Sequence, residues 1–289
     1  AELDALAPTL RTLLAPYAGP TERLKALVRE RPALALHNSH FNAAATAELA
    51  VAMVFALAKR VIELDAQMRR EVREGLVWTA GWQAPELSSR KLSGRTAVIL
   101  GYGAIGRRCA AMLDAVGMEV HAVRRHAPAV ASADGAAVVH GLSELGALLP
   151  KADVVLVCLP GTPETAGLLG PRELRSLPRG ALLVNVGRGN IVDEGALFDA
   201  LSDGHLGGAG LDVWYNYPML PGGAVTDGVA STWPASRAFH ELPNVVMSQH
   251  RGQASDAKAE DRVRDVTAML VALGRGGELP NRMDLDAGY

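Results

Sequence analysis

Arg188, Asp212 and His250 each lie at or just beyond the end of an apolar segment of the kind that forms buried parallel strands. Ligands of open parallel sheets bind at the carboxyl ends of the strands. Arginine can hold a carboxylate through two parallel hydrogen bonds, and histidine can exchange a proton near neutral pH. Arg188 is therefore a candidate to project into the cleft and His250 a candidate general acid or base, with Asp212 at a third strand end. The alternative is that Arg188 is a solvated surface cation, Asp212 a helix or turn cap and His250 a structural histidine.

The segment 95–126 has the pattern of a dinucleotide-binding βαβ unit. An apolar run, 96–100, leads directly into Gly101-Tyr102-Gly103-Ala104-Ile105-Gly106, and a helical stretch, 107–115, and a second strand, 118–123, follow. The first glycine of such a motif makes a tight turn, the second lets backbone approach a pyrophosphate, and the third lets helix and strand pack closely. The N-terminus of the helix presents free N–H groups to phosphates. We predict dinucleotide binding here over the alternative of a plain glycine-rich turn.

The end of the second strand of this unit bears on the choice of cofactor. NAD sites normally have an acidic residue about 20 positions beyond the glycines, where it binds the ribose 2′-hydroxyl, whereas NADP sites tend to have arginine. Here Arg124, Arg125 and His126 occupy that position, with no acidic residue among them. Guanidinium groups stay charged and can bind a 2′-phosphate bidentately. We therefore predict that NADP(H) is preferred, with NAD(H) as the second candidate, unless the arginines are simply a solvated strand end.

Composition limits the classes of protein to which the chain can belong. It has 289 residues with 29 Lys and Arg against 31 Asp and Glu, a net charge of −2 that argues against a nucleic-acid or membrane-surface partner. Its length allows one or two domains. The two cysteines, Cys109 and Cys158, indicate no disulfide framework and favour the reducing cytoplasm. We predict no metal site, because no cysteine or carboxylate cluster completes the pair His37 and His40.

Apolar and helical segments alternate along the chain, which predicts an α/β fold with a doubly wound parallel sheet covered on both faces. The predicted strands are 10–14, 33–37, 96–100, 118–123, 138–140, 154–159, 182–186, 210–213 and 245–248. The predicted helices are one before residue 10, then 21–31 with Thr21 as its N-cap, 46–73, 107–115, 142–149, 194–202 and 256–273. The helix 46–73 looks apolar nearly all round, so we predict that it is buried or forms a dimer.

Five motifs together resemble those of the NAD(P)-dependent D-isomer-specific 2-hydroxyacid dehydrogenases, a family that includes glyoxylate/hydroxypyruvate reductases and phosphoglycerate dehydrogenases. They are GYGAIG, CLPGTPET, NVGRG with IVDEGAL, GAGLDV and LPNVVMSQH. The resemblance extends over nearly the whole chain and implies two domains. Residues 43–253 would form a dinucleotide-binding Rossmann domain, and residues 1–42 and 254–289 a smaller, flavodoxin-like substrate domain. The family normally has further residues ahead of the segment LLAPYAG, without which the sheet of the smaller domain would have an exposed edge. We therefore expect that domain to be truncated at its N-terminus, with a naturally reduced domain as the alternative.

The resemblance also implies roles for individual residues. Arg188 would hold the substrate carboxylate and C2 carbonyl, His250 would donate a proton to that carbonyl, and the backbone of Ala18 and Gly19 would face the carboxylate. Asp212 would hold the carboxamide of the nicotinamide, and the loop after the strand 154–159 would form one side of the nicotinamide site. The residues assigned to the cofactor site are Gly101, Tyr102, Gly103, Ala104, Ile105, Gly106, Arg124, Arg125, Leu159, Pro160, Thr165, Val186, Gly187, Arg188, Asp212, His250 and Gly252.

One residue departs from the family pattern. Tyr217 stands where the family usually has a glutamate that pairs with the catalytic histidine. Opposite charges about 4 Å apart interact by roughly 4 kcal/mol at an effective dielectric constant of about 20, and a neutral phenol does not supply this attraction. We therefore expect the pKa of His250 to lie closer to its reference value of about 6.5 than in relatives that have the glutamate. Reduction should then be fastest at a more acidic pH than in relatives that have the glutamate.

The sequence thus predicts an oxidoreductase that transfers a hydride between NADP(H) and a small 2-keto or 2-hydroxy acid such as glyoxylate or hydroxypyruvate, and that forms a homodimer. Arg188, His250 and Tyr217 are its predicted catalytic residues. The alternative is a catalytically weak regulatory or scaffold protein that binds the dinucleotide on the same fold, because Tyr217 replaces the glutamate. The long loop 219–242 either shapes the substrate pocket through Trp233 or Phe239, or is a surface loop packed by its own aromatic residues.

Overall fold

The computed structural model describes residues 10–77, 88–125, 132–217 and 233–285. The chain separates into two compact units, one formed by residues 1–45 and 253–289 and the other by residues 46–252. We call them the small unit and the large unit, and each is described by itself. None of the described helices is long and apolar enough to cross a membrane.

The large unit is built on one eight-stranded sheet with the strand order β10-β9-β8-β7-β3-β4-β6-β5. Every neighbouring pair is parallel except β5 and β6, which run antiparallel. The strands are β3 (Thr96–Leu100), β4 (Glu119–Arg124), β5 (Ser132–Asp134), β6 (Ala137–Gly141), β7 (Val154–Val157), β8 (Leu182–Asn185), β9 (Gly208–Leu211) and β10 (Val245–Met247). The predicted α/β fold with a doubly wound parallel sheet is therefore confirmed.

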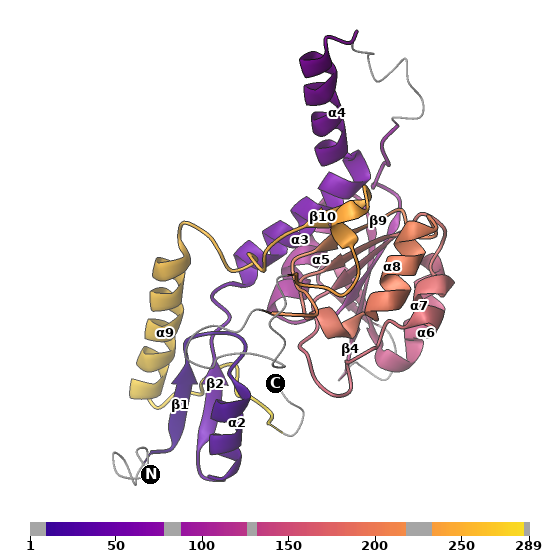
Figure 1. Cartoon of the computed structure of the whole chain (residues 1–289). Helices are drawn as coiled ribbons and strands as arrows, with labels where there is room; N and C mark the ends of the chain where they lie inside the picture. Colours follow the sequence, from indigo (N-terminus) through magenta and orange to yellow (C-terminus); the bar gives the residue numbers. More distant parts are fainter. Residues whose placement is uncertain (1–9, 78–87, 126–131, 218–232, 286–289) are drawn as a thin grey trace. The chain divides into compact units, whose positions relative to one another are not determined.

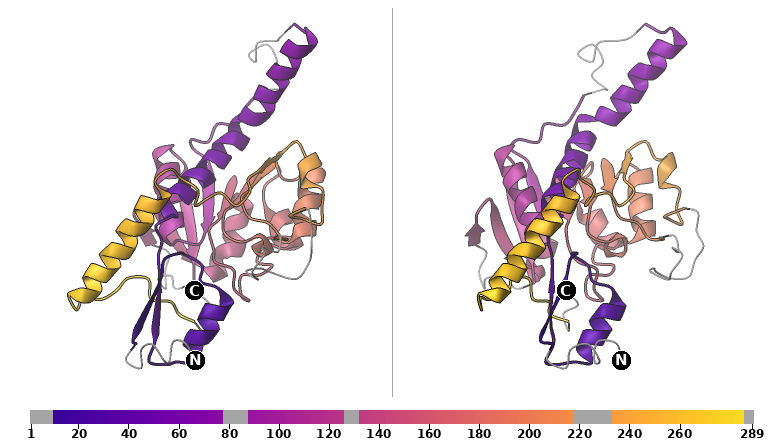
Figure 2. Two further views of the ribbon diagram at one scale, coloured as in Figure 1. Left: turned by 60° about the vertical axis from the view of Figure 1, so that its left-hand side comes forward. Right: turned by 90° about the vertical axis from the view of Figure 1, so that its left-hand side faces the viewer.

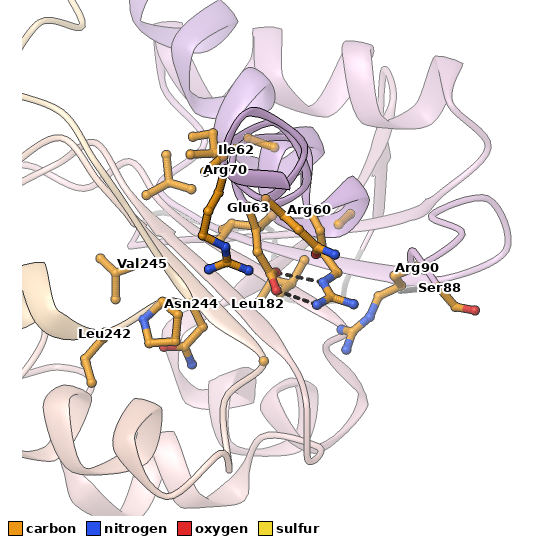
Figure 3. Close-up of a pocket in the computed structure, with 18 residues that line it drawn as sticks. Arg60, Ile62, Glu63, Arg70, Ser88, Arg90, Leu182, Leu242, Asn244 and Val245 are labelled. Atoms are coloured by element: carbon orange, nitrogen blue, oxygen red, sulfur yellow. Dashed lines mark hydrogen bonds and ion pairs between the residues drawn. The ribbon is translucent and has the colours of Figure 1, made fainter. Parts of the chain in front are cut away.

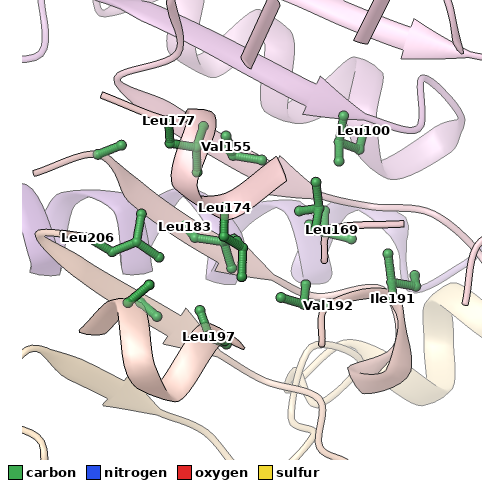
Figure 4. Close-up of a cluster of buried hydrophobic side chains, with 14 of the residues drawn as sticks. Leu100, Val155, Leu169, Leu174, Leu177, Leu183, Ile191, Val192, Leu197 and Leu206 are labelled. Carbon is green, nitrogen blue, oxygen red and sulfur yellow. The ribbon is translucent and has the colours of Figure 1, made fainter. Parts of the chain in front are cut away.

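Both faces of the sheet are covered, which explains why its central strands are apolar throughout. All four residues of β7 and of β8 are buried, so neither strand alternates polar with apolar residues. On one face the helices α6 (Leu145–Leu148), α7 (Pro171–Ser176) and α8 (Glu194–Ser202) cover a cluster rich in buried leucine and valine (Figure 4). On the other face α3 (Ala43–Lys59) and α5 (Ala104–Ala115) contribute to a second buried cluster.

The strand order reverses between β3 and β7. The chain runs from β3 outward through β4 and β6, then returns to the other side of β3 and continues through β7, β8, β9 and β10. Such a reversal leaves a crevice at the carboxyl ends of the strands, where ligands of doubly wound sheets bind. Arg188 follows β8, Asp212 follows β9 and His250 follows β10, so all three residues lie at this end of the sheet.

The prediction of one helix over 46–73 is wrong, because the structure has two helices there. α3 ends before Arg60, whose φ of 53° interrupts an α-helix, and α4 (Val61–Glu74) begins after it. The apolar residues belong mainly to α3, and many of them are buried in the core of the large unit. α4 has no buried residue and projects from the rest of the large unit (Figures 1 and 2). The apolar surface of α3 is thus explained by packing within the chain.

Three further elements differ from the prediction. The predicted helix 142–149 consists of the short α6 between two 3₁₀ turns, and Pro150, which has no N–H group, lies in the second turn. Neither β5 nor α7 is among the predicted elements. β5 has no apolar run, and it pairs with β6 through a turn at Gly135, whose φ is 60°. α7 has six residues, too few to show a helical period.

The small unit contains two parallel strands, β1 (Thr12–Ala15) and β2 (Ala35–Asn38), and the helices α2 (Glu22–Arg29) and α9 (Lys258–Gly274). α2 begins at its predicted N-cap, because the Thr21 hydroxyl accepts a hydrogen bond from the Leu24 N–H at 3.3 Å. A small apolar cluster joins β1, β2 and α2 to the segment after α9; its buried members are Ala15, Val28, Leu34, Leu36 and Met283. The predicted helix before residue 10 lies outside the described residues.

Candidate active site

Arg188 is held at the end of β8 by a buried asparagine. Asn185 is 1% exposed, and its side chain accepts a hydrogen bond from the Gly187 N–H at 3.0 Å and donates one to the Arg188 carbonyl at 2.9 Å. These bonds fix the backbone of the loop without using the guanidinium group. The exposed guanidinium donates one hydrogen bond to the Gly187 carbonyl at 2.7 Å. Because the group has five N–H donors, it can keep this bond and still bind a carboxylate.

Two glycines allow the close packing around Arg188. A Cβ atom on Gly161 would lie 2.9 Å from the Arg188 Cγ, so the stem of the arginine passes directly over Gly161. A Cβ atom on Gly189 would lie 2.2 Å from the Trp214 carbonyl oxygen. The backbone after β8 therefore approaches the backbone after β9 more closely than any side chain at position 189 would permit.

Asp212 organises the turn that carries His250. Its carboxylate is almost completely buried, and Oδ1 accepts hydrogen bonds from the Ser248 hydroxyl at 2.5 Å and the Arg251 N–H at 2.6 Å. Oδ2 accepts a hydrogen bond from the Gly252 N–H at 2.9 Å. A carboxylate has about four acceptor positions, so it can take a further donor such as a carboxamide N–H. The sequence places Asp212 at a strand end but does not predict that its carboxylate accepts hydrogen bonds from the turn of His250.

His250 lies on that turn with a φ of 56°, a left-handed conformation in which histidine is found more often than most residues. The residue is exposed at the carboxyl end of the sheet. Partial desolvation lowers the pKa of His250 below its ordinary value of 6.5, the positive charge of Arg188 lowers it further, and the charge of Asp212 opposes both effects. The side chains of Arg188 and His250 are thus close enough to interact electrostatically, and the structure brings the two to one site.

Tyr217 packs against His250, with the ring centroids 5.5 Å apart and the ring planes at 61°. Its hydroxyl oxygen accepts a hydrogen bond from the Trp214 N–H at 3.1 Å. Burial raises the pKa of Tyr217 above its ordinary value of 10, against smaller opposing effects of the Trp214 N–H and the Arg188 charge. The phenol is therefore neutral near pH 7. It contacts the imidazole but supplies no negative charge to hold it protonated.

The glycine turn after β3 has the geometry that a pyrophosphate requires. Gly101 has a φ of 99°, which glycine adopts without strain, and a Cβ atom on Gly106 would lie 2.0 Å from the Gly101 carbonyl oxygen. A Cβ atom on Gly103 would meet no described atom within 4 Å, so that side of the turn is open. α5 begins at Ala104 and presents its N-terminal N–H groups at the same place. The residues present therefore fit the phosphates of a dinucleotide.

Alanine substitutions in this turn should separate cofactor binding from folding. Gly103→Ala places a methyl group on the open side, so we expect the Kd for NADPH to rise about tenfold, or about 1.4 kcal/mol, with an unchanged Tm. Gly106→Ala brings a methyl group into collision with the Gly101 carbonyl oxygen, so we expect the free energy of unfolding to fall by about 1–3 kcal/mol. Titration with NADPH and thermal unfolding of both variants measure these effects. A Gly103→Ala variant that binds NADPH as tightly as the unaltered chain would contradict this assignment of the turn.

Tyr102 supports the turn from within the fold. Its side chain is 6% exposed, and its hydroxyl donates a hydrogen bond to the Asp134 carbonyl at 2.5 Å. The Arg107 guanidinium lies 4.4 Å from the ring centroid and forms an ion pair with the Asp134 carboxylate at 2.8 Å. The phenol of Tyr102 is thus a packing group that ties the glycine turn to the β5–β6 hairpin. Ala104 and Ile105 form the first turn of α5.

The corner predicted to select the cofactor lies at the end of β4. Arg124 is the last residue of that strand and is half-buried. Arg125 follows it and forms an ion pair with Glu164 at 3.6 Å. His126, the third residue of the predicted basic corner, lies outside the described residues.

Thr165 closes the turn that follows β7. Its hydroxyl accepts a hydrogen bond from the Thr162 N–H at 2.8 Å and donates one to the Pro160 carbonyl at 2.8 Å. The hydroxyl therefore positions the loop that is predicted to form one side of the nicotinamide site. The remaining predicted cofactor contacts at this end of the sheet are buried or half-buried; they are Leu159, Val186, Gly187 and Gly252.

The predicted substrate contacts Ala18 and Gly19 belong to the small unit. There they follow β1, and Asn38, at the end of β2, donates a side-chain hydrogen bond to the Ala18 carbonyl at 2.7 Å. The His37 Nδ1 lies 2.8 Å from the Pro280 carbonyl oxygen, which accounts for that histidine structurally. Over the residues that the structure describes, no three histidine, cysteine or acidic side chains are arranged to hold a metal ion.

Phe239 has neither of the two roles predicted for it in the loop 219–242. It is fully buried in the core of the large unit, edge-on to Phe198 and Trp214 and stacked on Tyr215. It is therefore a core residue rather than part of a substrate pocket or of a self-packed surface loop. Trp233 lies at the edge of the same cluster, with its ring centroid 6.3 Å from that of Trp214. The loop residues before Trp233 lie outside the described part of the chain.

A cavity of about 660 Å³ lies elsewhere in the large unit (Figure 3). Its lining includes residues of α4, Leu182 at the start of β8 and Asn244 just before β10. Arg60 and Glu63 form a two-point ion pair there, at 2.8 and 2.5 Å. The cavity is at the amino ends of these strands, whereas Arg188 and His250 are at the carboxyl ends. It is therefore distinct from the dinucleotide crevice.

Comparison with known proteins identifies the family. A model described as the NAD binding domain of D-isomer specific 2-hydroxyacid dehydrogenases matches residues 51–252. The chain belongs to this family. The match covers the glycine turn together with Arg188, Asp212 and His250, so the resemblance found in the motifs is confirmed.

Two curated members of the family illustrate the range of similarity. The chain is 33% identical to D-3-phosphoglycerate dehydrogenase of Mycobacterium leprae over 289 residues, which are 100% of this chain and 49% of that protein. It is 32% identical to glyoxylate reductase of Thermococcus litoralis over 244 residues, 84% of this chain and 67% of that one. The chain thus spans about half the length of the phosphoglycerate dehydrogenases that it matches.

Two solved structures to which the chain is similar have the same fold. One is an NADPH-dependent glyoxylate/hydroxypyruvate reductase of Sinorhizobium meliloti in complex with NADP and malonate. It is 26% identical, with a TM-score of 0.72 over 99% of this chain and 81% of that one. Another, the TT0316 protein of Thermus thermophilus, is 31% identical with a TM-score of 0.72 over 98% of this chain and 82% of that one.

Proposed function

We propose that this chain carries the catalytic centre of an NAD(P)-dependent oxidoreductase that interconverts small 2-keto and 2-hydroxy acids such as glyoxylate or hydroxypyruvate, with NADP(H) preferred. The observation that carries the proposal is that Arg188 and His250 both follow carboxyl ends of strands in the sheet that also bears the glycine turn, near enough for the charge of Arg188 to lower the pKa of His250. The names of the relatives support the reaction class. The Sinorhizobium structure, solved with NADP, supports the cofactor.

The residues of the site suit the reduction of a 2-keto acid. When bound, the nicotinamide cofactor supplies the hydride that C2 of the substrate receives. Arg188 binds the substrate carboxylate bidentately and so fixes the position of C2. His250 donates a proton to the carbonyl oxygen as negative charge develops there. Asp212 holds the turn of His250 in place through the hydrogen bonds described above.

The test of the proposal is NADPH oxidation in the presence of glyoxylate and of hydroxypyruvate, followed by absorbance and by identification of the hydroxy acid formed. We expect turnover with at least one of these acids and a higher kcat/KM with NADPH than with NADH. Binding of NADPH without oxidation by any small 2-keto acid would contradict the proposed activity. A higher kcat/KM with NADH would contradict the cofactor preference alone.

The pH profile should depend on the residue at position 217. The proton donor must be protonated, and the pKa of His250 lies below 6.5, so we expect the reductive kcat/KM to fall as the pH rises through that region. Tyr217→Glu adds a negative charge beside the imidazole, which raises its pKa and moves this fall upward by about one pH unit after allowance for solvent screening. Tyr217→Phe keeps the ring and serves as the control. An unshifted profile for Tyr217→Glu, or a flat profile up to about pH 9 for the unaltered chain, would contradict the role of His250.

We also propose that two chains associate through α4. Its apolar residues Val61, Leu64, Met68 and Val72 recur at helical spacing, and Val72 is 70% exposed. At about 100° per residue this stripe lies on the face opposite to the residues of α4 that line the cavity. An exposed apolar stripe on a projecting helix favours a contact with another protein surface.

Mass measurement in solution tests the dimer. One chain has a mass of 30.4 kDa, and we expect the unaltered protein to have twice this mass and Val72→Glu to dissociate to the monomer. Ala66→Glu adds the same charge on the cavity side of α4 and should leave the dimer intact. A monomer at micromolar concentration for the unaltered chain would contradict this part of the proposal.

The alternative of a catalytically weak scaffold receives no support from the comparisons. With Tyr217 in place of the glutamate, position 217 supplies no negative charge to His250, but Arg188 and Asp212 still act on the imidazole. A cytoplasmic location is part of the proposed function, and the free thiols of Cys109 and Cys158 agree with it.

A further inference from the structure

Arg125 and Glu164 connect two loops that lie on opposite sides of the glycine turn. Arg125 follows β4 directly, and Glu164 lies in the turn after β7. The Arg125 guanidinium is 3.6 Å from the Glu164 carboxylate. Both side chains are partly exposed, with 33% of the Arg125 side chain and 59% of the Glu164 side chain accessible. Sequence patterns gave no indication of this pair.

The strand order shows what this ion pair crosses. β3 is hydrogen-bonded to β4 on one side and to β7 on the other. Neighbouring strands are about 4.8 Å apart, so the ends of β4 and β7 are separated by about 10 Å, with the end of β3 between them. The turn that begins at Gly101 leaves β3 in that interval. The ion pair therefore joins the two flanks of the dinucleotide crevice.

The position of Glu164 is fixed by its own loop. The Thr165 hydroxyl closes the turn through the Thr162 N–H and the Pro160 carbonyl. The pKa of Glu164 is lowered, first by a hydrogen bond from the Thr162 side chain, then by its own backbone N–H, and also by the charge of Arg125. The carboxylate is therefore ionised near pH 7 and stands beside the arginine that is expected to receive a 2′-phosphate.

We propose that Glu164 sets the cofactor selectivity by competing with the 2′-phosphate of NADP(H) for Arg125. This inference rests on the proposed function, in which Arg125 binds that phosphate. A phosphate on Arg125 must displace the carboxylate or lie close to it, and like charges repel. A cofactor with a free 2′-hydroxyl meets no such repulsion. Glu164 thus narrows the preference for NADP(H) over NAD(H), although it lies on a different loop from the basic corner.

The competition can be measured with adenosine 2′,5′-bisphosphate and 5′-AMP, which share the adenosine group and differ in the 2′-phosphate. Their Kd values are determined by calorimetry for the unaltered chain, Glu164→Gln, Arg125→Gln and the double variant. We expect Glu164→Gln to bind the bisphosphate about fivefold more tightly, the scale of an exposed ion pair, with little change for 5′-AMP. We expect Arg125→Gln to weaken the bisphosphate selectively, and the Glu164→Gln gain to vanish in the double variant.

Asp203→Asn is the matched control. Asp203 also forms an exposed ion pair, with Arg175 at 2.6 Å, but it lies between α8 and the start of β9, at the amino-terminal side of the sheet. Its neutralisation changes the net charge by the same amount and should leave the bisphosphate-to-AMP ratio unchanged. An equal gain for Asp203→Asn would reduce the effect to net charge and overturn the inference.

The two remaining outcomes distinguish this inference from the cofactor assignment. If Arg125→Gln weakens the bisphosphate but Glu164→Gln brings no gain, the role of Glu164 is overturned and the basic corner stands. If Arg125→Gln binds the bisphosphate and 5′-AMP in an unchanged ratio, Arg125 does not bind the 2′-phosphate. Both the inference and that part of the proposed function then fail. All of these outcomes are measured as Kd values, so none of them requires catalytic turnover.

Discussion

Replacement of Arg188 by alanine is expected to lower kcat/KM for a 2-keto acid by about 10²–10⁴-fold. The substitution removes two charge-assisted hydrogen bonds to the substrate carboxylate, each worth roughly 1.5–3 kcal/mol. The Kd for NADPH should change little, because the loop is fixed by the Asn185 side chain and the backbone rather than by the guanidinium. Steady-state kinetics and NADPH titration of the same preparation give both quantities.

Two further variants test whether the loss in Arg188→Ala comes from the planar pair of donors at this position. Arg188→Lys keeps the positive charge but loses the planar pair of donors, so most of the loss should remain. Arg172→Ala removes an exposed arginine that pairs with the neighbouring Glu173, and it should leave kcat/KM unchanged. Near-normal turnover in Arg188→Ala, with NADPH still bound, would rule out the carboxylate-binding role of this arginine.

Substitution of His250 by asparagine should have an effect of similar size for a different reason. General acid catalysis contributes about 10²–10⁴-fold, and the asparagine amide cannot donate a proton to an alkoxide. Asparagine is preferred to alanine here because residue 250 has a φ of 56°, a conformation that asparagine tolerates. The Asp212 hydrogen bonds to Ser248, Arg251 and Gly252 do not involve the imidazole, so the turn should persist.

The pH profile provides the second measurement on His250→Asn. The residual kcat/KM should no longer fall across the pH range in which His250 loses its proton, since the titrating group is absent. His240→Asn is the control, because His240 lies beside Glu241 in the 3₁₀ turn before β10 and has no assigned role. A fall that persists unchanged in His250→Asn would assign the proton donor to another group.

Local sequence patterns predicted the elements whose cause is local. The helix 194–202 has the predicted bounds because Asp193 accepts a hydrogen bond from the Ala196 N–H at 2.8 Å and so caps its start. The buried strands, such as β3 at Thr96–Leu100, appear as apolar runs because both faces of the sheet are covered. The break at Arg60 has no such marker, since a single left-handed residue between two helical segments leaves the helical period almost undisturbed.

For the site, the sequence by itself determined which residue types stand at the strand ends and in the glycine turn. It thereby nominated Arg188, His250 and the corner that includes Arg125. Only the tertiary structure decided which of these side chains interact: Arg188 with His250, and Arg125 with Glu164. The physical reason is that strand order, and not distance along the chain, sets which loops meet at the end of a sheet. Periodicity and caps record neighbours a few residues apart, whereas these contacts join segments that only the folded sheet brings together.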